Sequence, residues 1–173
     1  PAPEPLPEKR MRIHPTSLPG LDTPVHVAWL DLPGSSPNAP VRVFLHGLGS
    51  SSIATFPEHA VQKPQNAPRS ILIDLPGFGY SRTAPAAWSF SMEDQADLVA
   101  GMLGELALGP VTLIGHSMGG SIAIALAARH PELVATLIAA EPNLDPGVGS
   151  LSSHIAAQPE ASFLARGHER LVH

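Results

Sequence analysis

The chain has 173 residues, a formal net charge of −5 at pH 7, 43% hydrophobic residues and 14% charged residues. This length and composition suit one globular domain with a sizeable core and exclude a disordered chain. No basic stripe points to nucleic acid, and no apolar run approaches the roughly 18 residues of a membrane span. Without cysteine, disulfides, thiolate metal sites and a cysteine nucleophile are excluded. We expect a soluble protein, and the composition leaves its compartment open with the cytoplasm slightly favoured.

The N-terminal part of the chain predicts a proline-rich segment followed by two antiparallel strands. Residues 1–20 hold the proline-rich segment and the first strand, and six prolines fall within the first 19 residues. Residues 11–17 and 25–31 have the short, alternating composition of strands that pair in an antiparallel manner.

From residue 41 to residue 140, short apolar runs alternate with helical patterns. The expected strands are residues 41–45, 71–73, 111–114 and 134–140. The expected helices are residues 53–61, a helix with Ser91 as N-cap that ends at Gly109-Pro110, residues 120–129 and, near the C-terminus, residues 160–172. This alternation predicts an α/β fold with a mostly parallel twisted sheet and helices on both of its faces.

Two of these helices carry an apolar stripe that predicts which side faces the sheet. The stripe of the shorter helix is Ile53, Phe56 and Ala60. The stripe of the helix after Ser91 is Met92, Ala96, Val99, Leu103 and Leu106.

The most informative motif is Gly115-His116-Ser117-Met118-Gly119, which lies between an expected strand and an expected helix. Strand, G-x-S-x-G and helix in this order predict a nucleophile elbow, a sharp turn that exposes a reactive serine hydroxyl. The alternative is a glycine-rich turn with an incidental serine. Two more motifs, His46-Gly47-Leu48-Gly49 and residues 74–81, also directly follow strands. Carboxyl ends of parallel strands meet at one edge of a sheet, so all three motifs should share a rim.

With these three motifs in this order, the chain resembles the α/β-hydrolase fold superfamily, in its esterase and lipase-like branch with a serine nucleophile. The resemblance extends over about residues 25–145. It implies that Ser117 is the nucleophile and that the main-chain N–H groups of Leu48 and Met118 form the oxyanion hole. It also implies that His46 and His116 line the site or support its loops, because the triad base comes last in the order serine, acid, histidine. Asp74 would likewise be a loop anchor.

The resemblance does not supply a complete triad within this sequence. The family usually places its acid after the seventh strand and its histidine after the eighth, whereas six strands are expected here. The alternative acid is Glu141, directly after the sixth strand, where some haloalkane dehalogenases carry theirs; a loop carboxylate is the competing interpretation. Asp145 is a weaker candidate. The histidines at positions 154, 168 and 173 fall where a cap would begin.

We therefore interpret the sequence as an N-terminal portion of the fold, truncated after the sixth strand. Its core would be residues 21–147, and residues 148–173 would begin a cap domain. The remaining C-terminal part of the same protein would be its partner, and residues 1–173 alone are predicted to be inactive because a serine without its base is a weak nucleophile.

The predicted function is that of a serine hydrolase that acts on a carboxylic ester or related acyl substrate through an acyl-enzyme. C–C bond hydrolysis, perhydrolysis and amide hydrolysis within the same fold are alternatives, and so is a non-catalytic small-molecule receptor. Dehalogenation and epoxide hydrolysis are disfavoured, because those reactions use an aspartate where this chain has Ser117. We expect no cofactor and no metal, since the histidines lack ligand spacing such as H-E-x-x-H.

Overall fold

The computed structural model describes residues 10–16, 22–36, 39–61, 67–81, 84, 86–144, 150–163 and 165. Contacts between residues divide the chain into two compact units, residues 1–143 and residues 144–173.

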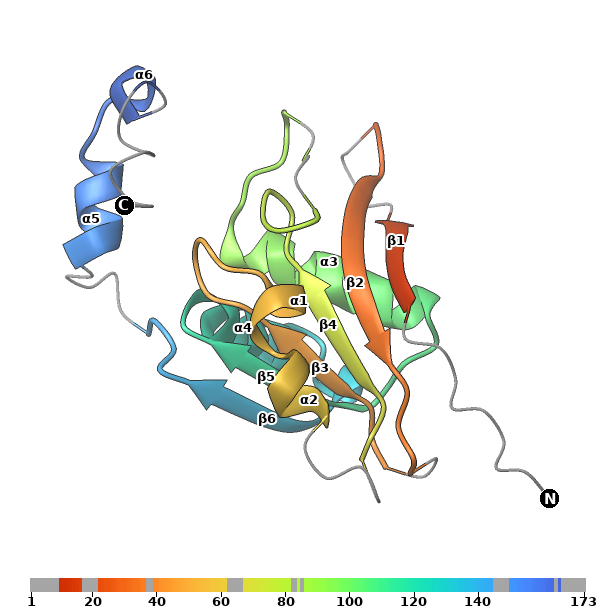
Figure 1. Cartoon of the computed structure of the whole chain (residues 1–173). Coiled ribbons are helices and arrows are strands. Elements are labelled where there is room, and N and C mark those ends of the chain that lie inside the picture. The colour runs from red at the N-terminus through yellow and green to blue at the C-terminus, as the bar shows by residue number, and fades with distance from the viewer. Residues whose placement is uncertain are drawn as a thin grey trace. The chain divides into compact units, whose positions relative to one another are not determined.

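The larger unit is built on a six-stranded sheet (Figure 1). Its strands are β1 (Arg10–Thr16), β2 (Val25–Leu32), β3 (Arg42–Leu45), β4 (Ser70–Asp74), β5 (Val111–His116) and β6 (Val134–Ala140). Their order is β1-β2-β4-β3-β5-β6; β1 pairs with β2 and β2 with β4 in antiparallel fashion, and the other pairs are parallel. The predicted mostly parallel sheet with an antiparallel start is confirmed.

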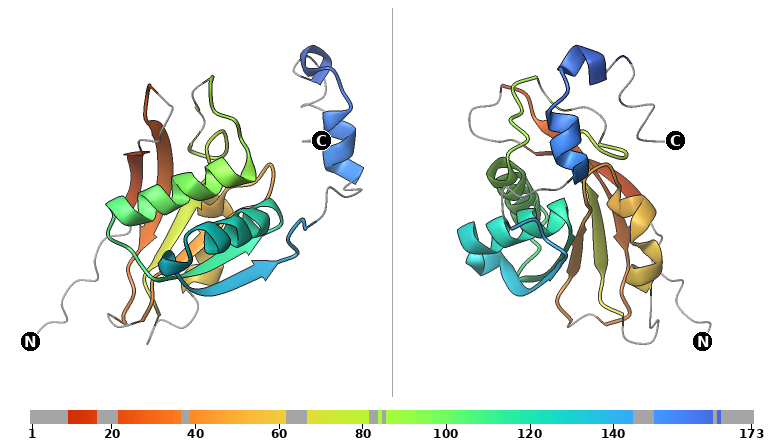
Figure 2. Two further views of the ribbon diagram at one scale, coloured as in Figure 1. Left: turned by 180° about the vertical axis from the view of Figure 1, so that it is seen from behind. Right: turned by 90° about the vertical axis from the view of Figure 1, so that its left-hand side faces the viewer.

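Helices cover both faces of this sheet, as the sequence predicted. The helices of the larger unit are α1 (Ser52–Thr55), α2 (Pro57–Val61), α3 (Met92–Glu105) and α4 (Met118–Arg129), followed by the short 3₁₀ helix η1 (Pro131–Leu133). Figures 1 and 2 show α1 and α2 on one face, with α3 and α4 on the other. The smaller unit contains α5 (Ser150–Ala156) and α6 (Glu160–Ser162).

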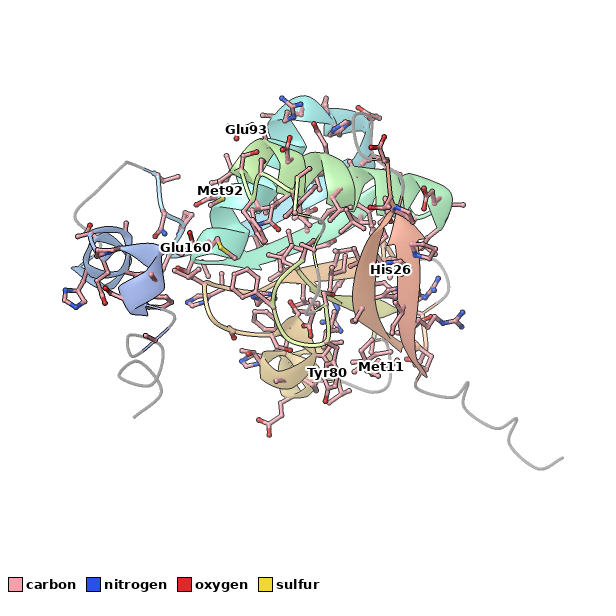
Figure 3. The ribbon with its side chains drawn as sticks, turned by 90° about the horizontal axis from the view of Figure 1, so that it is seen from above. Met11, His26, Tyr80, Met92, Glu93 and Glu160 are labelled. Atoms are coloured by element: carbon pink, nitrogen blue, oxygen red, sulfur yellow. The ribbon has the colours of Figure 1, made fainter. Side chains whose placement is uncertain are left out.

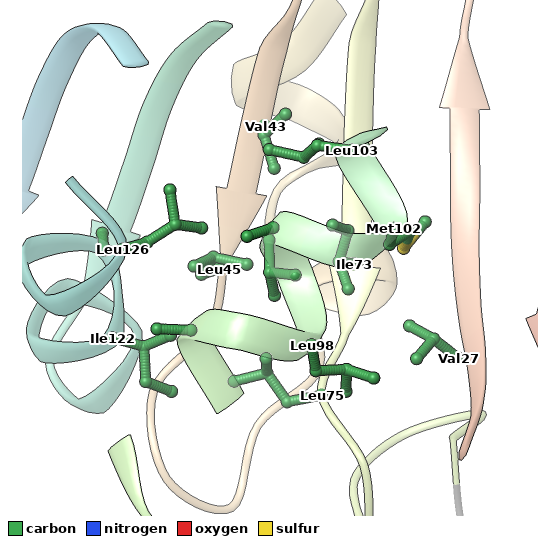
Figure 4. Close-up of a cluster of buried hydrophobic side chains, with 14 of the residues drawn as sticks. Val27, Val43, Leu45, Ile73, Leu75, Leu98, Met102, Leu103, Ile122 and Leu126 are labelled. Atoms are coloured by element: carbon green, nitrogen blue, oxygen red, sulfur yellow. The ribbon is translucent and has the colours of Figure 1, made fainter. Parts of the chain in front are cut away.

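The core lies in two layers, one on each side of the sheet. The larger layer joins α3 and α4 to the sheet through side chains such as Leu45, Ile73, Leu98 and Ile122, all fully buried (Figure 4). The smaller layer lies under α1 and α2, and its buried members are Leu32, Phe44, Ala60 and Leu72. Each fully buried large aliphatic side chain contributes about 1.5–3 kcal/mol, so packing on both faces stabilises the sheet.

The helix predicted over residues 53–61 is divided in two at Phe56. Pro57 starts α2, because proline lacks an N–H and disrupts the interior of a helix but fits its first turn. The predicted apolar face is nevertheless confirmed, since Ala60 is buried and both Ile53 and Phe56 pack against the same cluster.

The helix predicted after Ser91 is α3, and its cap is as expected. The Ser91 side chain accepts a hydrogen bond from the main-chain nitrogen of Asp94 at 3.0 Å. Ala96, Val99 and Leu103 are fully buried, but Met92 is exposed, which corrects the predicted stripe (Figure 3). Helical side chains lean toward the N-terminus, so the side chain of the first residue leans past the end of the helix.

The structure tests only the start of the helix predicted over residues 160–172, where α6 covers Glu160–Ser162. The separate helix α5, which precedes it, was not predicted. Residues 164 and 166–173 lie outside the described residues. Serine-rich α5 was missed because serine favours caps and turns over helix interiors.

Candidate active site

Ser117 lies on a sharp turn between β5 and α4, in the strand–turn–helix context that the sequence predicted. Its backbone has φ 52° and ψ −120°, a left-handed conformation that is strained for a residue with a side chain. Two glycines make the turn possible. A methyl group at Gly115 would overlap the carbonyl oxygen of Gly119, and one at Gly119 would overlap the carbonyl oxygen of Leu45. The backbone therefore has the geometry of a nucleophile elbow.

The loop after β3 lies directly beside this serine. A methyl group built at Gly47 would be 3.2 Å from Cβ of Ser117 and 3.2 Å from Nδ1 of His116. The loop turns sharply here: the nitrogen of Ser50 donates to the oxygen of Gly47 at 3.2 Å, and Gly49 has φ 71°. Leu48 follows Gly47 directly, so its N–H belongs to the segment that approaches the nucleophile.

Met118 supplies the second candidate N–H for an oxyanion. It is the first residue of α4, and the first N–H groups of a helix have no intrahelical acceptor. The positive end of the α4 dipole lies at the same point. The candidate donors Leu48 and Met118 are thus on the two segments that meet at Ser117. This agrees with the prediction that the loops after β3 and β5 lie at one edge of the sheet.

His46 is held inside the structure rather than at the site. It is 1% exposed, and its Nε2 accepts a hydrogen bond from the main-chain nitrogen of Leu75 at 3.0 Å. Because that nitrogen is a donor, Nε2 is unprotonated, and Nδ1–H donates to the oxygen of Gly47 at 2.7 Å. Burial lowers the pKa of His46, with smaller opposing effects from Gly47 and Asp74. Both ring nitrogens of His46 are hydrogen-bonded, so this side chain links the loop after β3 to the loop after β4.

Asp74 joins the same two loops from the end of β4. Its fully buried carboxylate accepts hydrogen bonds from Oγ of Ser51 at 2.8 and 2.9 Å, from the nitrogen of Ile53 at 3.1 Å and from the nitrogen of Tyr80 at 2.9 Å. Gly79 comes so close that a methyl group there would overlap Oδ2 of the carboxylate. These contacts give Asp74 the structural position that the resemblance implied.

His116 and Glu141 lie together at the outer edge of the rim. Nε2 of His116 is 3.8 Å from Oε2 of Glu141, and their side chains are 50% and 90% exposed. Glu141 follows β6 directly and has φ 48°, a second strained residue at the rim. The nitrogen of Ser117 donates to the oxygen of Ala140 at 2.9 Å, so the chain enters Glu141 beside the elbow.

Comparison with known proteins places this rim in a family. The model of the alpha/beta hydrolase fold matches residues 40–168. The chain belongs to the alpha/beta hydrolase fold family. It is 36% identical over 135 residues to the sn-1-specific diacylglycerol lipase ABHD11 of Mus musculus, a match that covers 78% of this chain and 42% of the lipase.

Two further relatives of this alpha/beta hydrolase act on acyl compounds by name. One is the pimeloyl-[acyl-carrier protein] methyl ester esterase of Neisseria meningitidis, 38% identical over 104 residues, 60% of this chain and 30% of the esterase. The other is a solved structure of the N-acyl homoserine lactonase AidH, with a TM-score of 0.64 and 27% identity, which matches 78% of this chain and 46% of that one. The chain thus spans less than half the length of these three relatives.

The other acidic and histidine candidates lie in the smaller unit or outside the described residues. His154 lies in α5 of the smaller unit. Asp145, His168 and His173 fall outside the part of the chain that the structure describes. Within that part, no three histidine or acidic side chains gather as metal ligands. No described helix has both the length and the apolarity to cross a membrane.

The sequence did not single out Ser121, one turn into α4. Its Oγ donates to the carbonyl oxygen of Asn143 at 2.7 Å, which draws the segment after Glu141 onto the start of the helix. The sequence around a helical serine does not indicate that its hydroxyl will bind a distant carbonyl oxygen. The local indication was Pro142, which favours a turn directly after Glu141.

Proposed function

We propose that this alpha/beta hydrolase is a serine hydrolase that cleaves a carboxylic ester or related acyl substrate through an acyl-enzyme. The observation that carries the proposal is the strained backbone of Ser117 at the turn between β5 and α4, with the Gly47–Leu48 segment alongside. Hydrolases of acyl compounds among its relatives support the same chemistry.

In the proposed reaction, Oγ of Ser117 attacks the substrate carbonyl carbon while a histidine takes its proton. The carbonyl oxygen becomes an oxyanion that accepts hydrogen bonds from the N–H groups of Leu48 and Met118, and one such donor is worth about 3 kcal/mol. The intermediate collapses, and the alcohol leaves with the proton from the imidazolium. Water then attacks the acyl-enzyme, the histidine passes the proton of that water to Ser117, and the acid is released.

We propose Glu141 as the triad acid, because it follows β6 immediately and the Ser117–Ala140 hydrogen bond keeps it at the rim. Its 90% exposed side chain leaves the carboxylate accessible to a histidine from elsewhere. The competing assignment is a rim carboxylate that lines the entrance.

The histidine would come from the remaining C-terminal part of the protein, and residues 1–173 alone would not turn over substrate. The exposed apolar surface of β6 supports this proposal. Leu137 and Ile138 lie on opposite faces of this edge strand and are 38% and 49% exposed. An edge strand that is apolar on both faces is the surface on which further strands and helices of an α/β sheet would pack.

Labelling the full-length protein with a fluorophosphonate tests the nucleophile. We expect stoichiometric modification of wild type, none of Ser117→Ala, and unchanged modification of the matched variant Ser153→Ala on α5. Tight reversible ligand binding without labelling would favour the receptor alternative. A substrate panel of small esters, amides and β-diketones, with a peroxide assay, then separates ester hydrolysis from amide hydrolysis, C–C bond hydrolysis and perhydrolysis.

A further inference from the structure

We propose that Ser121 is a positioning residue that holds Glu141 at the rim by anchoring the chain after it to the first turn of α4. The proposal rests on the proposed function, in which Glu141 is the triad acid. It assigns a role to a hydroxyl that touches no reacting atom.

The first step is the conformation of Glu141. Its φ of 48° is in the left-handed region, which residues other than glycine, asparagine and aspartate rarely adopt. Such a conformation persists only where neighbouring contacts hold it. In the described part of the larger unit, the other non-glycine residues with positive φ are Phe90, Ala107 and Ser117. Strain therefore occurs at both the candidate nucleophile and the candidate acid.

The second step is that the elbow and α4 together hold the chain on both sides of Glu141. Before it, the oxygen of Ala140 accepts a hydrogen bond from the nitrogen of Ser117 at 2.9 Å. After it, the oxygen of Asn143 accepts one from Oγ of Ser121 at 2.7 Å. The first anchor is the main chain of the elbow, and the second is a side chain in the first turn of α4.

The third step is the close packing between these anchors. A methyl group at Gly120 would be 3.0 Å from Cβ of Pro142, tighter than an ordinary contact. The ring of Pro142 also fixes the φ angle of the residue that follows Glu141. The segment from Ala140 to Asn143 is therefore held across the start of α4 by two hydrogen bonds and one packing contact.

The remaining contact of Glu141 is too weak to do this alone. Its carboxylate is 3.8 Å from Nε2 of His116, and both side chains are at least half exposed. Exposed pairs of this kind add little, because water screens them and two side chains must be ordered. The Ser117–Ala140 bond is part of the elbow itself, so Ser121 supplies the side-chain hydrogen bond that, together with the packing of Pro142 on Gly120, holds the left-handed backbone of Glu141.

If the Ser121 hydroxyl is removed, the oxygen of Asn143 loses this partner and Glu141 is free to return to negative φ. Rotation about φ redirects the Cα–Cβ bond, so the carboxylate would point elsewhere while Ser117 stays in place. We therefore expect a lower turnover number with an unchanged elbow, which is the signature of a positioning residue.

The test compares Ser121→Ala, Ser121→Thr, Glu141→Gln and the double variant Ser121→Ala/Glu141→Gln in the full-length protein. We expect Ser121→Ala to lower kcat about tenfold with KM unchanged, and Ser121→Thr, which keeps the hydroxyl, to stay within about twofold of wild type. In the Glu141→Gln background, Ser121→Ala should change kcat by less than about twofold, because its effect passes through the carboxylate.

The chemical shifts of Cα and Cβ of Glu141 give a readout that does not depend on catalysis, because they differ between positive and negative φ. We expect these shifts to change in Ser121→Ala and to keep their wild-type values in Ser121→Thr. Unchanged shifts in Ser121→Ala overturn the proposal, and so does an equal loss of kcat in both Glu141 backgrounds, which would show a purely structural role. Failure of fluorophosphonate to label wild-type Ser117 instead identifies failure of the proposed function, and the positioning role falls with it.

Discussion

The main-chain nitrogen of Ser117 donates a hydrogen bond to the carbonyl oxygen of Ala140 at 2.9 Å. This bond extends the parallel pairing of β5 with β6, in which His116 lies opposite Ala140, by one more residue. It joins the turn that carries the candidate nucleophile to the strand end that carries the candidate acid. Distortion of either strand end should therefore affect both groups.

The elbow should not tolerate a side chain at Gly119. In Gly119→Ala, the new methyl group would overlap the oxygen of Leu45, so α4 must move away from β3. We expect a loss of about 3 kcal/mol in the free energy of unfolding, measured by urea denaturation. The control is Gly104→Ala on the exposed side of α3, where a methyl group meets no atom within 4 Å. That control should gain about 0.5–1 kcal/mol from helix propensity, and equal effects of the two variants would contradict the account.

Replacing the Asp74 carboxylate should loosen both rim loops. In Asp74→Asn, one oxygen becomes an NH₂ group that faces an N–H donor, that of Ile53 if Oδ1 is replaced or that of Tyr80 if Oδ2 is replaced. We expect a loss of about 2 kcal/mol in unfolding free energy, together with faster hydrogen exchange in residues 47–53 and 77–81. Asp22→Asn, at an exposed position, is the control and should change neither measurement. Wild-type stability of Asp74→Asn would show that the buried contacts are dispensable.

Burial of His46 should make stability sensitive to acid. The pKa of this histidine in the folded protein is below the ordinary value of 6.5. As pH falls below about 6.5, the unfolded chain takes up a proton at this position before the folded protein does, so stability decreases. We expect the wild-type Tm to fall over this range more steeply than the Tm of His46→Gln, measured by calorimetry at pH 5 to 8. Parallel Tm curves would contradict the prediction.

An ion-pair network between α3 and α4 should make stability sensitive to acid at a lower pH than His46 does. Asp97 accepts hydrogen bonds from Nε and Nη2 of Arg129 at 2.8 and 2.6 Å and pairs with Nε2 of His130 at 2.8 Å. Arg129 makes the largest contribution in lowering the pKa of Asp97 from 3.8 to about 2, and His130 adds to it. A carboxylate whose pKa is lower in the folded protein than in the unfolded chain stabilises the fold above about pH 4. This stabilisation is lost as pH falls toward 2.

The variant Asp97→Asn should therefore show a flatter dependence of Tm on pH between 4 and 2 than wild type, and a lower Tm at pH 7. Glu58→Gln, at an exposed position in α2, is the control and should follow the wild-type curve. If the Tm of Asp97→Asn falls between pH 4 and 2 as much as the wild-type Tm does, this network is not the source of the acid sensitivity.

Much of the fold could be predicted because its signals are local. The strand–turn–helix around Ser117 follows from an apolar run, two glycines and a helix-forming run that are adjacent in sequence. The cap of α3 likewise depends on Ser91 and on Asp94 three residues later. Where propensity was ambiguous, as in serine-rich α5, or where Pro57 interrupts an apolar stripe, the predicted boundaries were wrong.

The order of the strands along the chain, the elbow and the family resemblance could be predicted from local pattern alone. Residue spacing and turn-forming residues are properties of neighbouring positions in the sequence. The partners of individual side chains depended on the folded chain. The contacts of Ser121 with Asn143 and of Asp97 with Arg129 join residues 22 and 32 positions apart. The sheet brings such residues together through its β3-β5-β6 order and the crossing helices, and no local pattern records that proximity.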